Sequence, residues 1–177
     1  MKIVDIFAPY LFAFWFDSQP KDEYNMAMNN WLDTEYLKEF HEKYYDGFIR
    51  NNDFFPQKDF LGFSSFIIKN ANVIDNKLVK AADDGNISDN FEILSEGNDL
   101  SEILPKRKST QQILRFYGIQ LGSVIIIAGS AIKLTKKMKD HPLTNQQLLK
   151  INALQDFLRD NSITDEETFF DYLSEQD

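Results

Sequence analysis

The strongest constraint on the fold is VIIIA at residues 124–128, a run in which every side chain is apolar. A strand with one face in water alternates apolar and polar residues, whereas an uninterrupted apolar run favours a strand covered on both faces. ILRFYGI and a Leu-Gly-Ser turn precede this run, and SAIKLT follows it. This part of the chain therefore predicts three successive strands, with VIIIA as a central one.

The N-terminal half predicts a strand pair followed by helices. IVDIFA and YLFAFWFD are rich in aromatic and branched residues and are separated near Pro9, which favours a hairpin or a broken strand. From Lys21 to about Gly47 the apolar residues have helical spacing, and Asp33 is a suitable N-cap for a second helix there. From Phe60 to Ala81 the spacing predicts a further amphipathic helix.

The C-terminal part predicts two more helices and one long loop. Thr144 begins a helix with Gln147 at the capping-box position, and Thr164 is the expected N-cap of a helix over 164–173. We interpret 161–177 as a helical appendage on a single domain that spans 1–177. Residues 83–102 are rich in acids and contain no base, so they predict an acidic loop in which only FEIL forms a strand or fills the core.

Composition excludes several classes of protein. The chain has 177 residues, of which 43% are hydrophobic, and this is enough to build a core. It has no cysteine, which excludes disulfides, thiolate zinc sites and a cysteine nucleophile. Neither a nucleotide-binding loop nor metal-ligand spacing occurs, so we expect no cofactor and no metal. The apolar runs are shorter than the ~20 residues that cross a bilayer, so we expect a soluble, cytoplasmic protein.

The charge distribution has a sharp boundary. The formal net charge is −9, yet the 37 residues from Ile103 to Lys139 contain no Asp or Glu and eight bases. This predicts a basic face on an acidic body, suited to the phosphates of RNA. An alternative is that lysines protect strand edges and that the acidic loop folds over them. The eight bases are Lys106, Arg107, Lys108, Arg115, Lys133, Lys136, Lys137 and Lys139.

The segment LRFYGIQLGSVIIIAGSAIKLTKKM, followed by a His-Pro pair and a helix, resembles the RelE/ParE superfamily of toxins from toxin–antitoxin modules. It is most similar to a longer branch with the pattern LRxYAIxI, ITGGAIKLTxxM and HPxT. The similarity covers residues 113–173 and extends weakly to WLDTEYLKEF at residues 31–40. The resemblance implies an α+β fold, with helices packed on one face of a curved antiparallel sheet. The chain departs from the pattern at Gly129-Ser130, where the family has two glycines.

The resemblance also implies an activity and partners. RelE-like toxins cleave mRNA on the ribosome without a metal, and an antitoxin neutralises them. Carried over to this sequence, Arg115, Tyr117, Lys133 and His141 are the candidate catalytic residues of an endoribonuclease. Lys106, Arg107, Lys108, Lys136, Lys137 and Lys139 are the candidate RNA-binding residues. ParE-like relatives share the fold but act on gyrase, so the fold does not choose the reaction.

Each candidate residue also has an ordinary structural interpretation. Strand alternation places Leu114 and Phe116 on one face, so Arg115 and Tyr117 face an open surface if the helices cover the first two. His141 is either a general base beside lysines or part of the entry into the following helix. His41 is expected to be exposed. Our second hypothesis is a non-catalytic descendant of the toxin fold that acts as a protein-interaction module, with its own acidic segment over the basic face.

Overall fold

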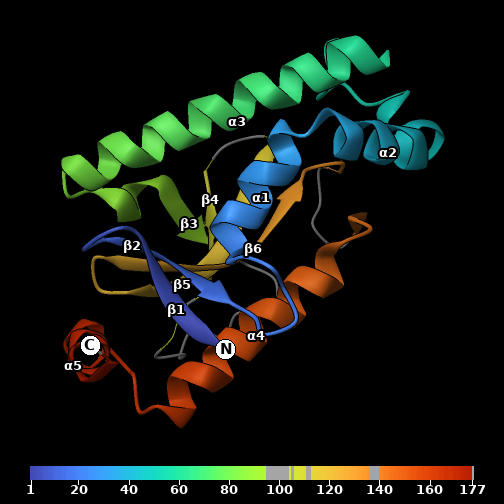
Figure 1. The fold of residues 1–177 in the computed structure, drawn as a ribbon. Helices are drawn as coiled ribbons and strands as arrows, with labels where there is room; N and C mark the ends of the chain where they lie inside the picture. The colour runs from blue at the N-terminus through green and yellow to red at the C-terminus, as the bar shows by residue number, and fades with distance from the viewer. Residues whose placement is uncertain (95–103, 105, 111–112, 136–139, 177) are drawn as a thin grey trace.

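The computed structural model describes residues 1–94, 104, 106–110, 113–135 and 140–176. In this part of the chain, strands and helices form an α+β fold around one open six-stranded sheet with the order β1-β2-β6-β5-β4-β3 (Figure 1). The strands are β1 (Lys2–Phe7), β2 (Leu11–Trp15), β3 (Phe91–Ile93), β4 (Lys106–Ser109), β5 (Leu114–Leu121) and β6 (Val124–Ile132).

The sheet is mixed, because one of its strand pairs is parallel. β1 and β2 form the predicted antiparallel hairpin, and β5 and β6 form a second one. β2 and β6 run parallel, with Phe12 opposite Ile126, so the implied purely antiparallel sheet is wrong. The VIIIA run is central and fully buried, as predicted, but the two strands expected over 124–135 are one continuous strand, β6.

Helices form where the apolar spacing predicts them. α1 (Glu23–Leu32) and α2 (Thr34–Tyr44) meet at Asp33, whose carboxylate accepts the N–H of Glu35 at 2.9 Å. The other helical segments are η1 (Tyr45–Ile49), α3 (Phe60–Asp83), η2 (Ile87–Asn90), α4 (Thr144–Asp160) and α5 (Glu166–Gln176). His41 on α2 is buried rather than exposed, with its Nε2 2.8 Å from the carbonyl oxygen of Lys58.

Helices cover both faces of the sheet, which corrects the expectation of a single helical layer. α1, α2 and α3 pack on one face, against a core that includes Leu114, Phe116 and Ile127. α4 and α5 pack on the other face, against a core that includes Tyr117 and Ile126. Figure 1 shows α3 and α4 on opposite sides of the sheet. The physical reason is the central strand itself, because an all-apolar strand needs cover on both sides.

A bulge between β5 and β6 sets which side chains share a face. Tyr117 pairs with Gly129 but Gly118 pairs with Ile127, so Ala128 is an extra residue in β6. The extra residue reverses the alternation along β6. As a result Ala131, which is paired with Arg115, lies in the α4-side core, although Ile125 and Ile127 lie in the α3-side core.

The two C-terminal helices begin differently from the prediction. Gln147 does not cap its own helix: its side-chain oxygen accepts the N–H of Ser130 on β6 at 2.9 Å. Asp165, rather than Thr164, caps α5 by accepting the N–H of Thr168 at 2.8 Å. α5 is attached to the sheet by the fully buried Phe169 and by Glu166, which accepts the N–H of Ser123 at 2.8 Å.

The acidic segment 83–102 is described only as far as residue 94. FEIL forms the short edge strand β3 and places Leu94 in the core, so both alternatives predicted for it are realised together. β3 pairs antiparallel with β4, with Glu92 directly opposite Lys108.

Candidate basic site on the sheet

Strand alternation places Arg115 and Tyr117 on the predicted face of β5, but this face is not open. Leu114 and Phe116 point to the α3-side core, as expected. Arg115 and Tyr117 point to the α4 side, where they are only 8% and 6% exposed. The expectation of an open surface is wrong because α4 and the buried Leu104 side chain cover this side too.

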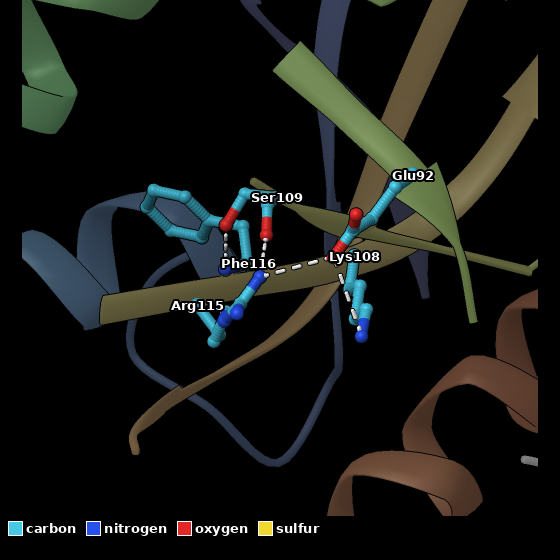
Figure 2. A network of polar contacts seen from close by, with 5 residues as sticks. All are labelled: Glu92, Lys108, Ser109, Arg115 and Phe116. Carbon is cyan, nitrogen blue, oxygen red and sulfur yellow. Dashed lines mark hydrogen bonds and ion pairs between the residues drawn. The ribbon is translucent and has the colours of Figure 1, made fainter. Parts of the chain in front are cut away.

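Arg115 is held by a compact polar network (Figure 2). Its Nη1 donates a hydrogen bond to the carbonyl oxygen of Ser109 and lies 3.5 Å from a carboxylate oxygen of Glu92. The same Glu92 oxygen lies 3.3 Å from the ammonium of Lys108. Ser109 also accepts the N–H of Phe116 through its hydroxyl, at 2.9 Å. The guanidinium is therefore positioned by β3 and β4 and points along the edge of the sheet.

Lys133 interacts electrostatically with the residues of this network. It follows the end of β6, where its N–H donates to the carbonyl oxygen of Ile113 at 2.7 Å and its ammonium lies 5.1 Å from the centre of the Phe54 ring. Partial burial, followed by the charges of Arg115 and Lys108, lowers the pKa of Lys133, and Glu92 opposes this effect. We call Lys108, Arg115 and Lys133 the basic cluster.

Tyr117 is not suited to proton transfer near neutral pH. Burial raises the pKa of its hydroxyl to about 12, although the charge of Arg115 acts in the opposite direction. The Tyr117 ring lies in the α4-side core. In the strand register, Tyr117 is opposite Lys108 on β4 and opposite Gly129 on β6. Its contribution is therefore to packing beneath the basic cluster.

His141 uses both ring nitrogens in local structure. Nδ1 accepts the N–H of Leu143 at 3.0 Å, so Nε2 carries the proton and donates it to the carbonyl oxygen of Ile132 at 2.8 Å. Burial lowers the pKa of His141, and the bond to Ile132 opposes this. This arrangement matches the interpretation of the His-Pro pair as the entry into α4, and it leaves no ring nitrogen for a general base.

The neutral, hydrogen-bonded ring of His141 predicts that the free energy of unfolding depends on pH. The folded pKa lies below the ordinary value of about 6.5, so the neutral ring stabilises the fold above that pH. This stabilisation is lost as the pH falls through the folded pKa. Urea unfolding at about pH 7.5 and about pH 5.5 should show a larger loss of unfolding free energy for the wild type than for His141→Asn. Equal losses in both proteins would contradict the assignment.

The remaining candidates are divided between buried and undescribed positions. Lys106 is buried and Arg107 is partly buried, so neither presents a free ammonium or guanidinium on an open face. On β4, Lys108 pairs with the same Glu92 carboxylate that contacts Arg115. Lys136, Lys137 and Lys139 lie outside the described residues.

Two members of the site, Glu92 and Ser109, are not predicted by the sequence pattern. Glu92 was assigned to the acidic loop, and the strand that carries Ser109 was not predicted. The sequence does contain a signal for Glu92. FEIL is the one apolar motif in that segment, and if it forms a strand that pairs with residues 106–108, Glu92 lies beside the bases of those residues.

The fold and the site together define the protein as an α+β protein with a partly buried basic cluster at one end of a mixed sheet. Comparisons with protein-family models, with curated proteins and with solved structures each find no match to this chain. Within the described residues, every helix is too short or too polar to cross a membrane. The same residues contain no group of three or more His, Asp or Glu side chains that could hold a metal ion.

Proposed function

We propose that the protein is a non-catalytic relative of the RelE/ParE toxins and acts as a protein-interaction module. Its basic cluster binds an acidic segment of a partner protein, and an antitoxin-like protein is the natural partner. The single observation behind this proposal is that Glu92, from the acidic segment 83–102, already occupies the cluster by pairing with Arg115 and Lys108. A surface that accepts a carboxylate from its own chain has the chemistry to accept one from another chain.

The state of the implied catalytic residues supports a non-catalytic role. Cleavage at a 2′-hydroxyl needs a base and an acid that transfer protons near neutral pH. Burial raises the pKa of Tyr117 to about 12, and both nitrogens of His141 are engaged by backbone groups. Arg115 and Lys133 remain as cations, but cations without a paired acid and base do not form such a site.

A second candidate is a toxin that engages RNA or the ribosome through the same cluster. One observation favours it: among the described residues, Lys108 and Arg115 pair with one carboxylate, that of Glu92, and Lys133 adds a third positive charge nearby, so this part of the cluster keeps an excess of positive charge. Phosphates would suit that excess as well as carboxylates do. The two candidates differ in whether expression harms the cell and whether RNA is cut.

Strong induction of the gene in a bacterial host separates them. We expect unchanged growth and intact mRNA, since Tyr117 and His141, the candidate proton-transfer groups, are not available for proton transfer near neutral pH. A Lys133→Ala variant is the matched control, and it should behave like the wild type. Growth arrest with cut mRNA in the wild type, abolished in Lys133→Ala, would overturn the proposal in favour of the toxin.

Binding can be measured directly with a glutamate-rich peptide by fluorescence anisotropy. Glu92→Gln removes the internal carboxylate, so it should tighten peptide binding roughly tenfold, which corresponds to about 1.4 kcal/mol. Lys133→Ala should weaken it. No binding of the peptide to either the wild type or Glu92→Gln would contradict an acidic partner at this cluster.

A further inference from the structure

The outer face of α3 is unlike the rest of the acidic surface. α3 has 24 residues and spans about 36 Å along the outside of the molecule (Figure 1). Its inner face is buried from Phe63 to Ala81. Its outer face carries an exposed row at helical spacing, which we call the lysine stripe and define as Lys69, Val73, Asn76, Lys77 and Lys80.

The stripe has few of the counter-charges that an exposed helix commonly has. Acids three or four residues from a lysine stabilise a surface helix, yet no acid lies at such a position from Lys69 or Lys77, and only Lys80 is followed at this spacing by acids, Asp83 and Asp84. Lys77 and Lys80 are three residues apart and repel each other. Asp75 is half-buried and accepts a hydrogen bond from the Tyr24 hydroxyl. Within the described residues, no ion pair joins Lys69, Lys77 or Lys80 to an acid.

Apolar side chains lie along the same face. Val73 is 53% exposed and lies between Lys69 and Lys80 on the stripe, and Val79 is 37% exposed beside it. The spacing of residues 69, 73, 76 and 80 repeats every three or four positions, which matches the contact line between two packed helices.

We propose that the lysine stripe is a second docking surface, which binds an acidic amphipathic helix of a partner protein. Glutamates of that helix pair with Lys69, Lys77 and Lys80, and an apolar residue of the helix covers Val73. A short acidic helix fits better than a nucleic acid because the net charge of −9 repels a long polyanion beyond the stripe. A membrane fits poorly because the exposed apolar residues are few and separated.

The surface is distinct from the basic cluster, since α3 lies on one side of the sheet and Arg115 points to the other. A protein with both surfaces can hold two acidic partner segments at once, one on each side of the sheet. The proposal therefore goes beyond the proposed function, and each can fail without the other.

The test is binding of a glutamate- and leucine-containing helical peptide of about 18 residues to the full chain. We expect the double variant Lys69→Glu/Lys80→Glu to bind at least about tenfold more weakly than the wild type. Lys21→Glu/Lys38→Glu, which changes the net charge equally at exposed positions elsewhere, should bind like the wild type. In the Lys133→Ala background, which weakens binding at the basic cluster, Lys69→Glu/Lys80→Glu should still weaken binding of the helical peptide to the same extent, which separates this surface from the basic cluster.

Several results would overturn the proposal. Absence of peptide binding to the wild type is one, and equal weakening in the Lys21/Lys38 control is another, because it reports only the total charge. Stripe-dependent binding of an RNA oligonucleotide or of anionic lipid vesicles, stronger than that of the peptide, would assign the surface to another class of partner. Circular dichroism of both double variants checks that the exposed substitutions leave the fold intact.

Discussion

Gly118→Ala is expected to lower the free energy of unfolding by about 3 kcal/mol or more, because the added methyl group has no space. A Cβ at this position would overlap the carbonyl oxygen of Ile126 and lie 2.9 Å from its carbon, and 3.1 Å from the Cα of Ile127. These are backbone atoms of the central strand, so no side-chain rotation relieves the overlap. β5 and β6 would have to separate at the bulge.

Thermal unfolding measures this effect. A loss of that size corresponds to a fall in melting temperature of roughly 6–12 °C for a chain of this length. Gly47→Ala is the matched control, because a Cβ there meets no heavy atom within 4 Å. It should change the unfolding free energy by no more than about 0.5 kcal/mol. A Gly118→Ala protein as stable as the wild type would show that the two strands do not approach so closely.

The same glycine matters for the basic site. The bulge beside Gly118 reverses the alternation along β6 and so places Ala131 opposite Arg115 on the α4 side. Lys133 follows two residues later, near enough for Arg115 to lower its pKa. A change at the bulge is therefore expected to disturb the basic cluster as well as the core.

Apolar periodicity predicted most of the elements correctly, because burial decides where such segments pack. The central VIIIA strand, the N-terminal hairpin and the α1–α2 bend at Asp33 agree with it. β4 was missed because its residues are Lys106 to Ser109, with no apolar side chain among them. Its stability comes from ladder hydrogen bonds to β3 and β5 and from the pairing of Glu92 with Lys108, which a local pattern does not contain.

The basic residues of the site could be identified from the sequence, but their burial and their pairing with Glu92 could not. Lys108, Arg115 and Lys133 all come from the acid-free window, and the structure brings them near one another. Alternation correctly predicted the face of Arg115. The prediction that Arg115 and Tyr117 face an open surface was wrong, because α4, from a later part of the sequence, packs on this face. The single acid of the site was missed for the same reason: Glu92 reaches Arg115 only after β3 and β4 have paired.

Lys150→Ala is expected to lower the free energy of unfolding by about 2–4 kcal/mol, because it leaves a buried carboxylate without its cation. The Glu23 side chain on α1 is only 2% exposed and lies 2.7 Å from the ammonium of Lys150 on α4. Gln19 donates a further hydrogen bond to Glu23 at 2.8 Å, but it carries no charge. Partial exposure of Lys150 places the expected cost below that of a fully buried pair.

A double variant distinguishes the stranded charge from lost packing. Replacing both partners, as Glu23→Gln/Lys150→Ala, removes the two charges but keeps the same loss of side-chain volume at position 150, so it should recover most of the loss if the stranded carboxylate is the cause. Urea unfolding of the wild type, the single variant and the double variant provides the comparison. If the double variant is as unstable as Lys150→Ala, the contact of Lys150 with its neighbours, such as Phe16, carries the effect instead of the ion pair. Recovery would establish that the cost in Lys150→Ala comes from the unpaired Glu23 carboxylate, which is buried on α1 and is neutralised from α4 in the wild type.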